Sequence, residues 1–153
     1  MNGRERGWAL FDLDQTLVSW DMQAVWGNWV LRRQGWRRIL LWPFLGLLPL
    51  AKVLGSGTMK RLFLGCCWAM ERRDLEEVAE AFAERYVPAI CYPDILEMLE
   101  KEKAAGRKTV LVSASPESYV GRMGARLGCD HAVGTVVDWG EEAVGWCPRL
   151  PKG

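Results

Sequence analysis

Two short apolar runs that stop at polar residues predict the principal strands of this chain. The first covers residues 8–11 and stops at Asp12 and Asp14. The second covers residues 108–112, in which the charged Lys108 is followed by apolar or β-branched residues, and stops at Ser113. Runs of four to eight apolar or β-branched residues bounded by turn residues are typical of buried strands. A shorter strand through Val133 and a hairpin over 136–144 at the sheet edge complete the predicted strands.

Helical periodicity begins further along the chain, at Asp74. An apolar stripe with glutamates on the other faces predicts a surface helix, and the stripe consists of Leu75, Val78, Ala79, Phe82 and Tyr86. Asp74 and Glu77 resemble a capping box, and Pro88 is expected to end this helix. Another helix is predicted from Ile95 to about Ala105, where Gly106 stops it.

The residues after the second strand are typical of a helix start. Ser115 is expected as the N-cap, Pro116 as the first helical residue and Glu117 as an acid in the first turn, with the helix running to about Leu127. The amide groups and positive dipole end of such a helix favour a phosphate. We therefore expect an anion site beside Asp12.

An uncharged apolar stretch from Ile39 to Leu50 is interrupted by two prolines. Basic residues flank it, namely Arg32, Arg33, Arg37 and Arg38 before it and Lys52, Lys60 and Arg61 after it. A spanning helix needs about 20 apolar residues, so this run fits a segment that lies in one leaflet with its flanks on anionic headgroups. A buried hairpin that covers the active site is the alternative.

Tryptophans gather just before this stretch, at Trp20, Trp26, Trp29 and Trp36. Trp26 and Trp29 are spaced for one helix face, which predicts a packed helix. The alternative is an interfacial belt, in which indoles lie between lipid tails and headgroups.

Composition sets mild bounds on function. The chain has 153 residues, 50% hydrophobic and 25% charged, with a formal net charge of +1, so we expect no nucleic-acid partner. Its five cysteines include no C-x-x-C pair, which favours neither disulfides nor zinc and indicates a reducing cytosol. No signal peptide is predicted.

The pair Asp12 and Asp14 carries the candidate chemistry. Alternate side chains of a strand share a face, so both carboxylates can point into one crevice with a metal between them. One carboxylate can attack phosphorus while the other handles the proton of the leaving group. No set of Cys or His ligands is present and His131 receives no role, so oxygen atoms must hold the metal, for which magnesium is the natural choice.

These residues resemble the haloacid dehalogenase superfamily, whose first strand ends in D-x-D-x-[TV]; Asp12, Asp14 and Thr16 match it. The second motif of that family is a strand ending in Ser or Thr, and residues 108–116 supply it. The roughly hundred residues between the motifs leave room for a helical cap, as in subfamily IB, the phosphoserine phosphatase-like branch. Within that branch, residues 31–34, the apolar run and the turn at 113–116 look most like the phosphatidylglycerophosphatase C group.

The resemblance implies an α/β fold, with a Rossmann-like three-layer core of parallel sheet and an inserted helical cap. The core would comprise residues 1–17 and 89–153, and the cap residues 18–88. The implied catalytic residues are Asp12 and Asp14, which also hold Mg²⁺, and the implied phosphate-binding residues are Thr16, Ser113 and Ala114. Gln15 departs from the usual glycine of the family.

Relatives continue with a motif lysine and a strand that carries further aspartates. The acidic element is absent from this sequence, and Lys152 is one candidate for the lysine. Alternatively, Gly153 is the glycine that precedes the lysine in the family pattern. We therefore expect the core to be incomplete at its C-terminal side, with an open edge at the first strand, and the 153-residue chain to be hydrolytically inert or nearly so.

The leading hypothesis is a magnesium-dependent phosphatase that acts through an aspartyl-phosphate on a phospholipid headgroup such as phosphatidylglycerophosphate. A soluble small-molecule phosphatase of the phosphoserine type is the first alternative, and a catalytically incomplete membrane-binding or interaction fragment is the second. The expected location is cytoplasmic, with attachment to the inner face of the cytoplasmic membrane under the lipid hypothesis. The sequence does not specify the oligomeric state.

Overall fold

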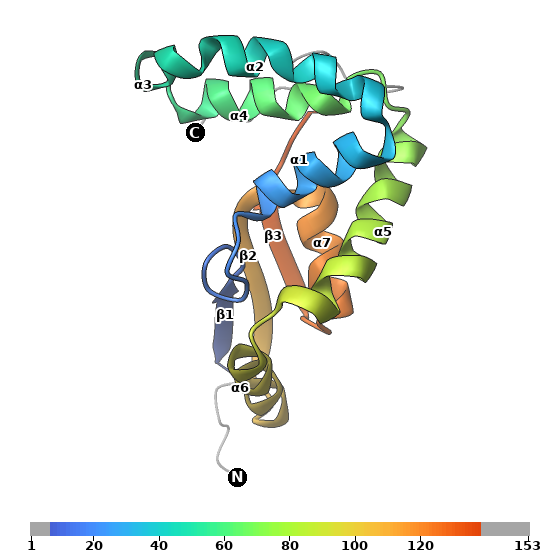
Figure 1. The fold of residues 1–153 in the computed structure, drawn as a ribbon. Coiled ribbons are helices and arrows are strands. Elements are labelled where there is room, and N and C mark those ends of the chain that lie inside the picture. Colours follow the sequence, from blue (N-terminus) through green and yellow to red (C-terminus); the bar gives the residue numbers. More distant parts are fainter. Residues whose placement is uncertain (1–6, 139–153) are drawn as a thin grey trace. The chain divides into compact units, whose positions relative to one another are not determined.

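The computed structural model describes residues 7–138 and contains a three-stranded parallel sheet (Figure 1). The strands are β1 (Trp8–Asp12), β2 (Lys108–Pro116) and β3 (His131–Thr135), in the order β1-β2-β3. In the register of the first pair, Trp8 lies opposite Lys108 and Asp12 opposite Val112. Because parallel strands end at the same edge, the aspartate motif and Ser113 are brought to one edge, as the sequence predicts.

The two outer strands differ in burial from the middle one. Most of β2 is buried, whereas Trp8 and Leu10 of β1 are 59% and 68% exposed. Among the described residues β1 pairs with β2 alone, and only the face that carries Phe11 is covered. The prediction of a buried strand thus holds for only one face of β1, which is an edge strand within residues 7–138, as the expected open edge of the first strand implies.

The described residues divide into two compact units. We call residues 7–22 and 79–135 the core unit, and residues 23–78 with 136–138 the helical unit. The helix α5 (Arg72–Ile90) contributes its first residues to the helical unit and the rest to the core unit.

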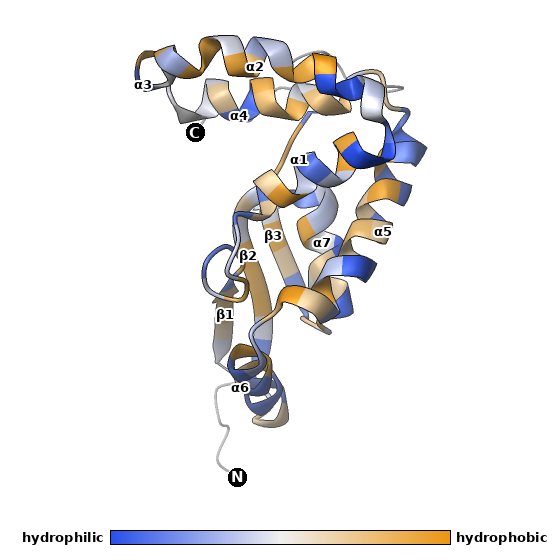
Figure 2. Ribbon diagram, viewed as in Figure 1, coloured by the Kyte–Doolittle hydropathy of each residue, from blue (hydrophilic) through white to orange (hydrophobic). Residues whose placement is uncertain are grey.

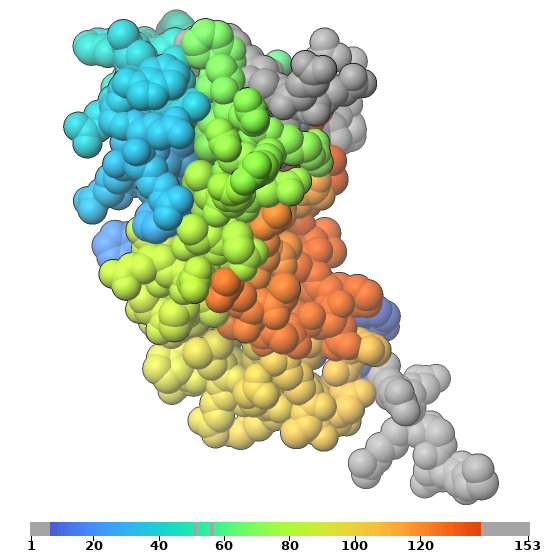
Figure 3. Space-filling model, turned by 90° about the vertical axis from the view of Figure 1, so that its right-hand side faces the viewer, coloured from blue at the N-terminus to red at the C-terminus, as the bar shows by residue number. Residues whose placement is uncertain are grey.

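In the core unit, α7 (Glu117–Arg126) packs on β2 and β3. Figure 3 shows α7 beside the C-terminal part of α5, where Arg126 donates to Glu80 over 2.6 Å. The third helix, α6 (Pro93–Ala104), precedes β2, and the glycine that follows it, Gly106, has a φ of 76°. The predicted helix over 95–105 is thus confirmed to within two residues.

The ends of α5 and α7 differ from the sequence-based expectation. Helix α5 begins at Arg72 rather than Asp74, and Pro88 lies inside its last turn instead of ending it. A proline there removes only one of the final hydrogen bonds, which limits the disruption. At the start of α7 the N-cap is Pro116, and Ser115 makes no cap hydrogen bond.

The helical unit is built from short helices. They are α1 (Met22–Arg33), η1 (Gly35–Leu41), α2 (Trp42–Leu47), η2 (Leu48–Leu50), α3 (Ala51–Leu54), α4 (Ser56–Leu64) and η3 (Gly65–Cys67), followed by the start of α5. Trp26 is fully buried, which confirms a packed helix at that position, while Trp20 and Trp36 are exposed. The absence of a side chain at Gly27 admits the ring of Phe63, because a Cβ at this position would clash with the Cζ of that ring.

The apolar stretch Ile39–Leu50 is mostly exposed, with Leu40 as its only buried residue. Within the helical unit the stretch therefore forms a largely exposed surface. Figure 2 shows apolar residues along α2 and α4. In residues 7–138, no helix has the length and apolarity needed to cross a bilayer. Beyond Asp138, the predicted hairpin over 136–144 lies outside the described residues.

Candidate active site

The turn after β1 carries both aspartates of the first motif. The β ladder extends past Asp12, because the Leu13 amide donates to Val112 over 3.1 Å. The turn then closes on itself, since the amides of Leu17 and Val18 donate to Asp12 and Leu13 over 3.2 and 3.1 Å. The three apolar residues of the turn, Leu13, Leu17 and Val18, are fully buried. This apolar anchoring leaves the intervening polar side chains at the surface of the sheet edge.

Gln15 lies at the tip of this turn with a φ of 59°. This left-handed conformation costs a residue with a Cβ roughly 1–2 kcal/mol, and glycine adopts it freely. The turn geometry therefore explains why the resembled family carries glycine here. It also shows that Gln15 keeps the turn at the expense of some strain.

Asp14 is half-buried and held by three donors. Its Oδ2 accepts from the hydroxyl of Ser113 over 2.8 Å and from that of Ser115 over 3.1 Å. Its Oδ1 accepts from the amide of Met22, at the start of α1, over 2.8 Å. The carboxylate is therefore fixed by the end of β2 and by the chain that leaves the motif turn.

Ser113 has a second contact that fixes its own hydroxyl. The amide of Ser115 donates to Ser113 Oγ over 2.9 Å, while Ser113 donates onward to Asp14. Both serines are buried. The two serines and Asp14 form one hydrogen-bonded group across the parallel strand ends.

Asp12 is exposed and makes weaker contacts than its neighbour. Its Oδ2 accepts from the Thr16 hydroxyl over 3.4 Å, a long hydrogen bond. Ala114 is exposed, and its carbonyl oxygen accepts from Thr135 over 2.7 Å. The structure thus joins Asp14 with Ser113 and Asp12 with Thr16, and places Ala114 beside Ser113 in the chain.

The residues of the turn suit a hard cation. Among residues 7–138, no group of three or more acidic, Cys or His side chains is gathered for a metal. Magnesium, however, usually keeps several waters and takes one or two carboxylates together with substrate phosphate. Asp12 retains nearly all of its acceptor capacity and Asp14 retains a lone pair on Oδ1, so both fit Mg²⁺ as ligands. Lys152 lies outside the described residues.

Sequence reasoning missed the contact of Ser115 with Asp14. The run Ser-Pro-Glu after a strand is typical of a helix cap, and that pattern obscured the other role of the hydroxyl. Gly134 is a sequence feature that reflects the close packing around Ser115. A Cβ at position 134 would lie 2.6 Å from Glu117 Cα and 2.9 Å from the carbonyl oxygen of Ser115. The close approach of β3 helps to set the position of the Ser115 backbone.

The family model of haloacid dehalogenase-like hydrolases matches residues 9–147. Among curated proteins, the chain is 32% identical over 144 residues to protein CicA of Caulobacter vibrioides, covering 87% of this chain and 60% of that protein. It is 24% identical over 137 residues to a probable phosphatase of Mycobacterium tuberculosis, covering 86% of this chain and 48% of that protein. The chain therefore spans about half to three fifths of the length of these relatives.

Solved structures share the fold. A Bordetella pertussis protein of unknown function matches with a TM-score of 0.76 and 19% identity, over 94% of this chain and 66% of that one. A phosphoserine phosphatase solved as a phospho-aspartyl intermediate analogue matches with a TM-score of 0.58 and 17% identity, over 96% of this chain and 64% of that one. At these identities the comparison supports the α/β fold.

Proposed function

The chain belongs to the haloacid dehalogenase-like hydrolases, and from that premise we propose that it is a magnesium-dependent phosphatase that works through a phosphorylated Asp12. Its relation to phosphatase-like hydrolases of this family marks it as an enzyme domain. The observation that carries the proposal is the contrast between the two aspartates. Asp12 is exposed with one long hydrogen bond, and Asp14 is fixed by three donors.

In the first step, an Asp12 carboxylate oxygen attacks phosphorus and the bond to the ester oxygen breaks. A protonated Asp14 gives its proton to that leaving oxygen, so an alcohol departs and an acyl phosphate remains on Asp12. In the second step, Asp14 takes a proton from water, whose oxygen attacks phosphorus and releases phosphate and the Asp12 carboxylate. Mg²⁺ held by Asp12, and by Asp14 whenever that carboxyl is ionised, would offset the charge of the phosphate.

The phosphate itself needs donors near Asp12. We assign this role to Thr16, Ser113 and the backbone at Ala114. Ser113 donates to Asp14 in the structure, so its hydroxyl must turn toward the phosphate when substrate binds. Ser115 keeps its own hydrogen bond to Asp14 during that exchange.

For the substrate we propose a phosphomonoester on a phospholipid headgroup, of which phosphatidylglycerophosphate is an example. The exposed apolar side chains of the helical unit support this proposal, with Trp42 at 69% and Val53 at 85% exposure. Between Asp21 and Glu71 the sequence has seven basic residues and no acidic residue. An apolar surface within a wholly basic segment suits the anionic face of a membrane.

Enzyme assays test both parts of the proposal. Phosphate release is measured with magnesium from vesicle-borne phosphatidylglycerophosphate and from phosphoserine, using the 153-residue chain and a version extended to the length of the curated relatives. We expect Asp12→Asn to abolish release and the lipid substrate to be preferred. A preference for phosphoserine would favour the soluble phosphatase, and inert chains of both lengths would favour the non-catalytic fragment.

A further inference from the structure

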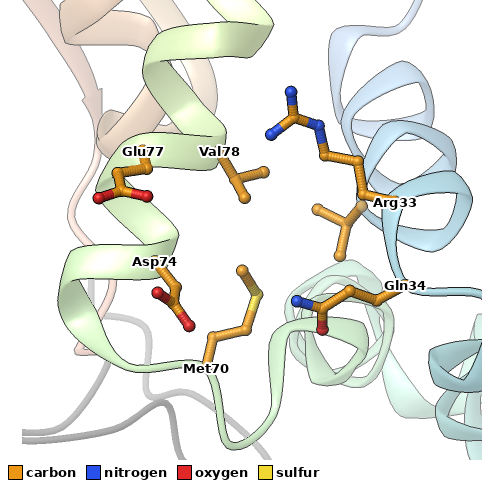
Figure 4. A pocket seen from close by; sticks show the side chains of 7 residues that line it. Arg33, Gln34, Met70, Asp74, Glu77 and Val78 are labelled. Carbon is orange, nitrogen blue, oxygen red and sulfur yellow. The ribbon is translucent and has the colours of Figure 1, made fainter.

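A pocket of about 450 Å³ opens in the helical unit, between the end of α1 and the first turns of α5 (Figure 4). Its volume lies in the range of small-molecule sites, which is about 300–1,000 Å³. The sequence gives no motif for it, and the proposed phosphatase chemistry uses none of its residues. Its walls differ in charge from one side to the other.

The floor of the pocket is apolar. Val30, Met70 and Val78 line it and are all buried. A floor of this kind accommodates methylene groups and excludes water from them. It offers no partner to a charged group, so charged parts of a ligand must be held at the walls.

One wall presents hydrogen-bond donors from the end of α1. The guanidinium of Arg33 lies 4.7 Å from the ring centroid of Trp29 and has no ion pair among the described residues. The carbonyl oxygen of the Gln34 side chain accepts from Arg37. That contact fixes the orientation of the amide, so the NH₂ group of Gln34 is the end left for the pocket. Arg33 and Gln34 together suit an oxyanion.

The opposite wall is acidic and belongs to α5. Asp74 and Glu77 are three residues apart, so they lie on one helix face. Glu77 accepts from Arg73 over 2.9 Å. Asp74 makes no hydrogen bond or ion pair within residues 7–138, and its charge interacts with Arg37 and Arg73 only at longer range. Figure 4 shows Asp74 across the pocket from Arg33 and Gln34. Asp74 is therefore the group best placed to receive a cation.

We propose that this pocket binds a small zwitterion of the aminoalkyl phosphate or amino acid type. The anionic group lies against Arg33 and Gln34, the ammonium group against Asp74, and the methylene groups over Met70. A simple anion would meet the acidic wall, and a simple cation would meet Arg33, so each is disfavoured by like charge. The ligand can be a free metabolite or the headgroup of a zwitterionic lipid, because both present the same pair of charges.

Calorimetry on the 153-residue chain tests this binding, with EDTA present so that no metal-dependent turnover takes place. O-phosphoethanolamine is the probe, and inorganic phosphate and ethanolamine are the singly charged comparisons. We expect Arg33→Gln and Asp74→Asn each to weaken binding of the probe by about tenfold, as loss of one charge-assisted contact implies. Arg32→Gln and Glu76→Gln are matched controls that remove a neighbouring charge outside the pocket.

The outcomes separate this site from the phosphatase site. Binding that survives Asp12→Asn and falls with Arg33→Gln supports the pocket whether or not the chain hydrolyses phosphate esters. Glycerophosphoethanolamine supplies the lipid arm: binding comparable to that of the probe assigns a headgroup, and much weaker binding assigns a free phosphomonoester. Equal binding of inorganic phosphate, equal losses in the control variants, or no binding at millimolar probe would overturn the proposal.

Discussion

The hydroxyl of Ser115 donates a hydrogen bond to Oδ2 of Asp14 over 3.1 Å, although the two residues are 101 positions apart in the chain. The same oxygen accepts from Ser113. If Ser113 turns to the phosphate during catalysis, Ser115 and the amide of Met22 are the donors that continue to hold Asp14. We therefore regard Ser115 as a positioning residue for the proposed acid and base.

Ser115→Ala should slow turnover about tenfold, because a hydrogen bond to a charged group contributes roughly 1.5–3 kcal/mol. The loss should fall on kcat rather than KM, since Ser115 does not touch the substrate in the proposed mechanism. Ser115→Thr, which keeps the hydroxyl, should restore most of the rate. Steady-state kinetics on the extended chain give kcat and KM for wild type, Ser115→Ala and Ser115→Thr. A change confined to KM in Ser115→Ala would argue for a substrate contact instead.

Asp12→Asn should abolish turnover, because an amide is a very poor nucleophile toward phosphorus. Asp14→Asn should lose most activity yet accumulate phosphoenzyme, since attack by Asp12 remains while activation of water is impaired. Rapid-quench trapping with ³²P-labelled substrate distinguishes the two variants. Wild-type turnover by Asp12→Asn would exclude this residue as the nucleophile.

Much of the core unit was predictable because local signals agree there with the tertiary structure. The apolar run before Asp12 and the Val-rich run before Ser113 became neighbouring parallel strands. Their polar ends then had to meet, since the carboxyl ends of parallel strands share an edge. The contact between Ser113 and Asp14 follows from this topology.

The misses occur where a tertiary contact outweighs a local pattern. The Ser115 hydroxyl donates to Asp14 instead of accepting from an amide of α7, and no sequence pattern shows which of these two partners is closer. Arg37 stands among exposed arginines in the sequence, yet it is buried and donates to the carbonyl oxygens of Cys66 and Trp68. Because Arg37 is buried, its assignment to a lipid-facing flank was wrong. The local sequence does not predict these contacts, since the two carbonyl oxygens are 29 and 31 residues away in the chain.

Arg37→Met should lower the free energy of unfolding by about 2 kcal/mol. Removing the guanidinium takes this donor away from the buried carbonyl oxygen of Cys66, which costs roughly 1–3 kcal/mol. Burial lowers the pKa of Arg37, so the variant also recovers part of its desolvation cost. Urea unfolding is the measurement, and Arg38→Met, at an exposed neighbour, should change stability by less than about 0.5 kcal/mol. Equal effects of the two substitutions would contradict the buried role.

Asp130 should make stability depend on pH in the acid range. Hydrogen bonds from the Lys108 ammonium and the Thr109 amide lower the pKa of Asp130 to about 2. Because the folded pKa lies below the unfolded value of about 3.9, this contribution is present above pH 4 and is lost as the pH falls toward 2. Thermal unfolding of Asp130→Asn should therefore show a lower Tm at pH 7 and a gap to wild type that narrows between pH 4 and 2. If the difference in Tm between Asp130→Asn and wild type stayed constant from pH 4 to pH 2, the ionised carboxylate would be excluded as the cause of that difference.

The exposed surface of the helical unit should bind anionic vesicles through charge attraction and through insertion of apolar side chains, and the two contributions can be measured separately. Replacing Arg32, Arg38 and Lys52 by Gln should weaken binding by about 1 kcal/mol for each side chain near the surface. The difference in affinity between this variant and wild type should shrink at high salt, because salt screens the attraction between the basic side chains of wild type and the anionic lipids. Arg37 is kept because it is buried, and Arg33 because it lines the pocket.

Trp36→Ser with Trp42→Ser should weaken vesicle binding at both salt concentrations, because insertion of indoles depends on apolar area rather than on charge. Lys101→Gln, on α6 of the core unit, is the control that removes a charge from outside this surface. Vesicle sedimentation with anionic and neutral lipids gives all of these affinities. If the tryptophan variant binds as wild type does, or if wild type binds neither lipid, the exposed apolar side chains serve another contact and the lipid substrate loses its main support.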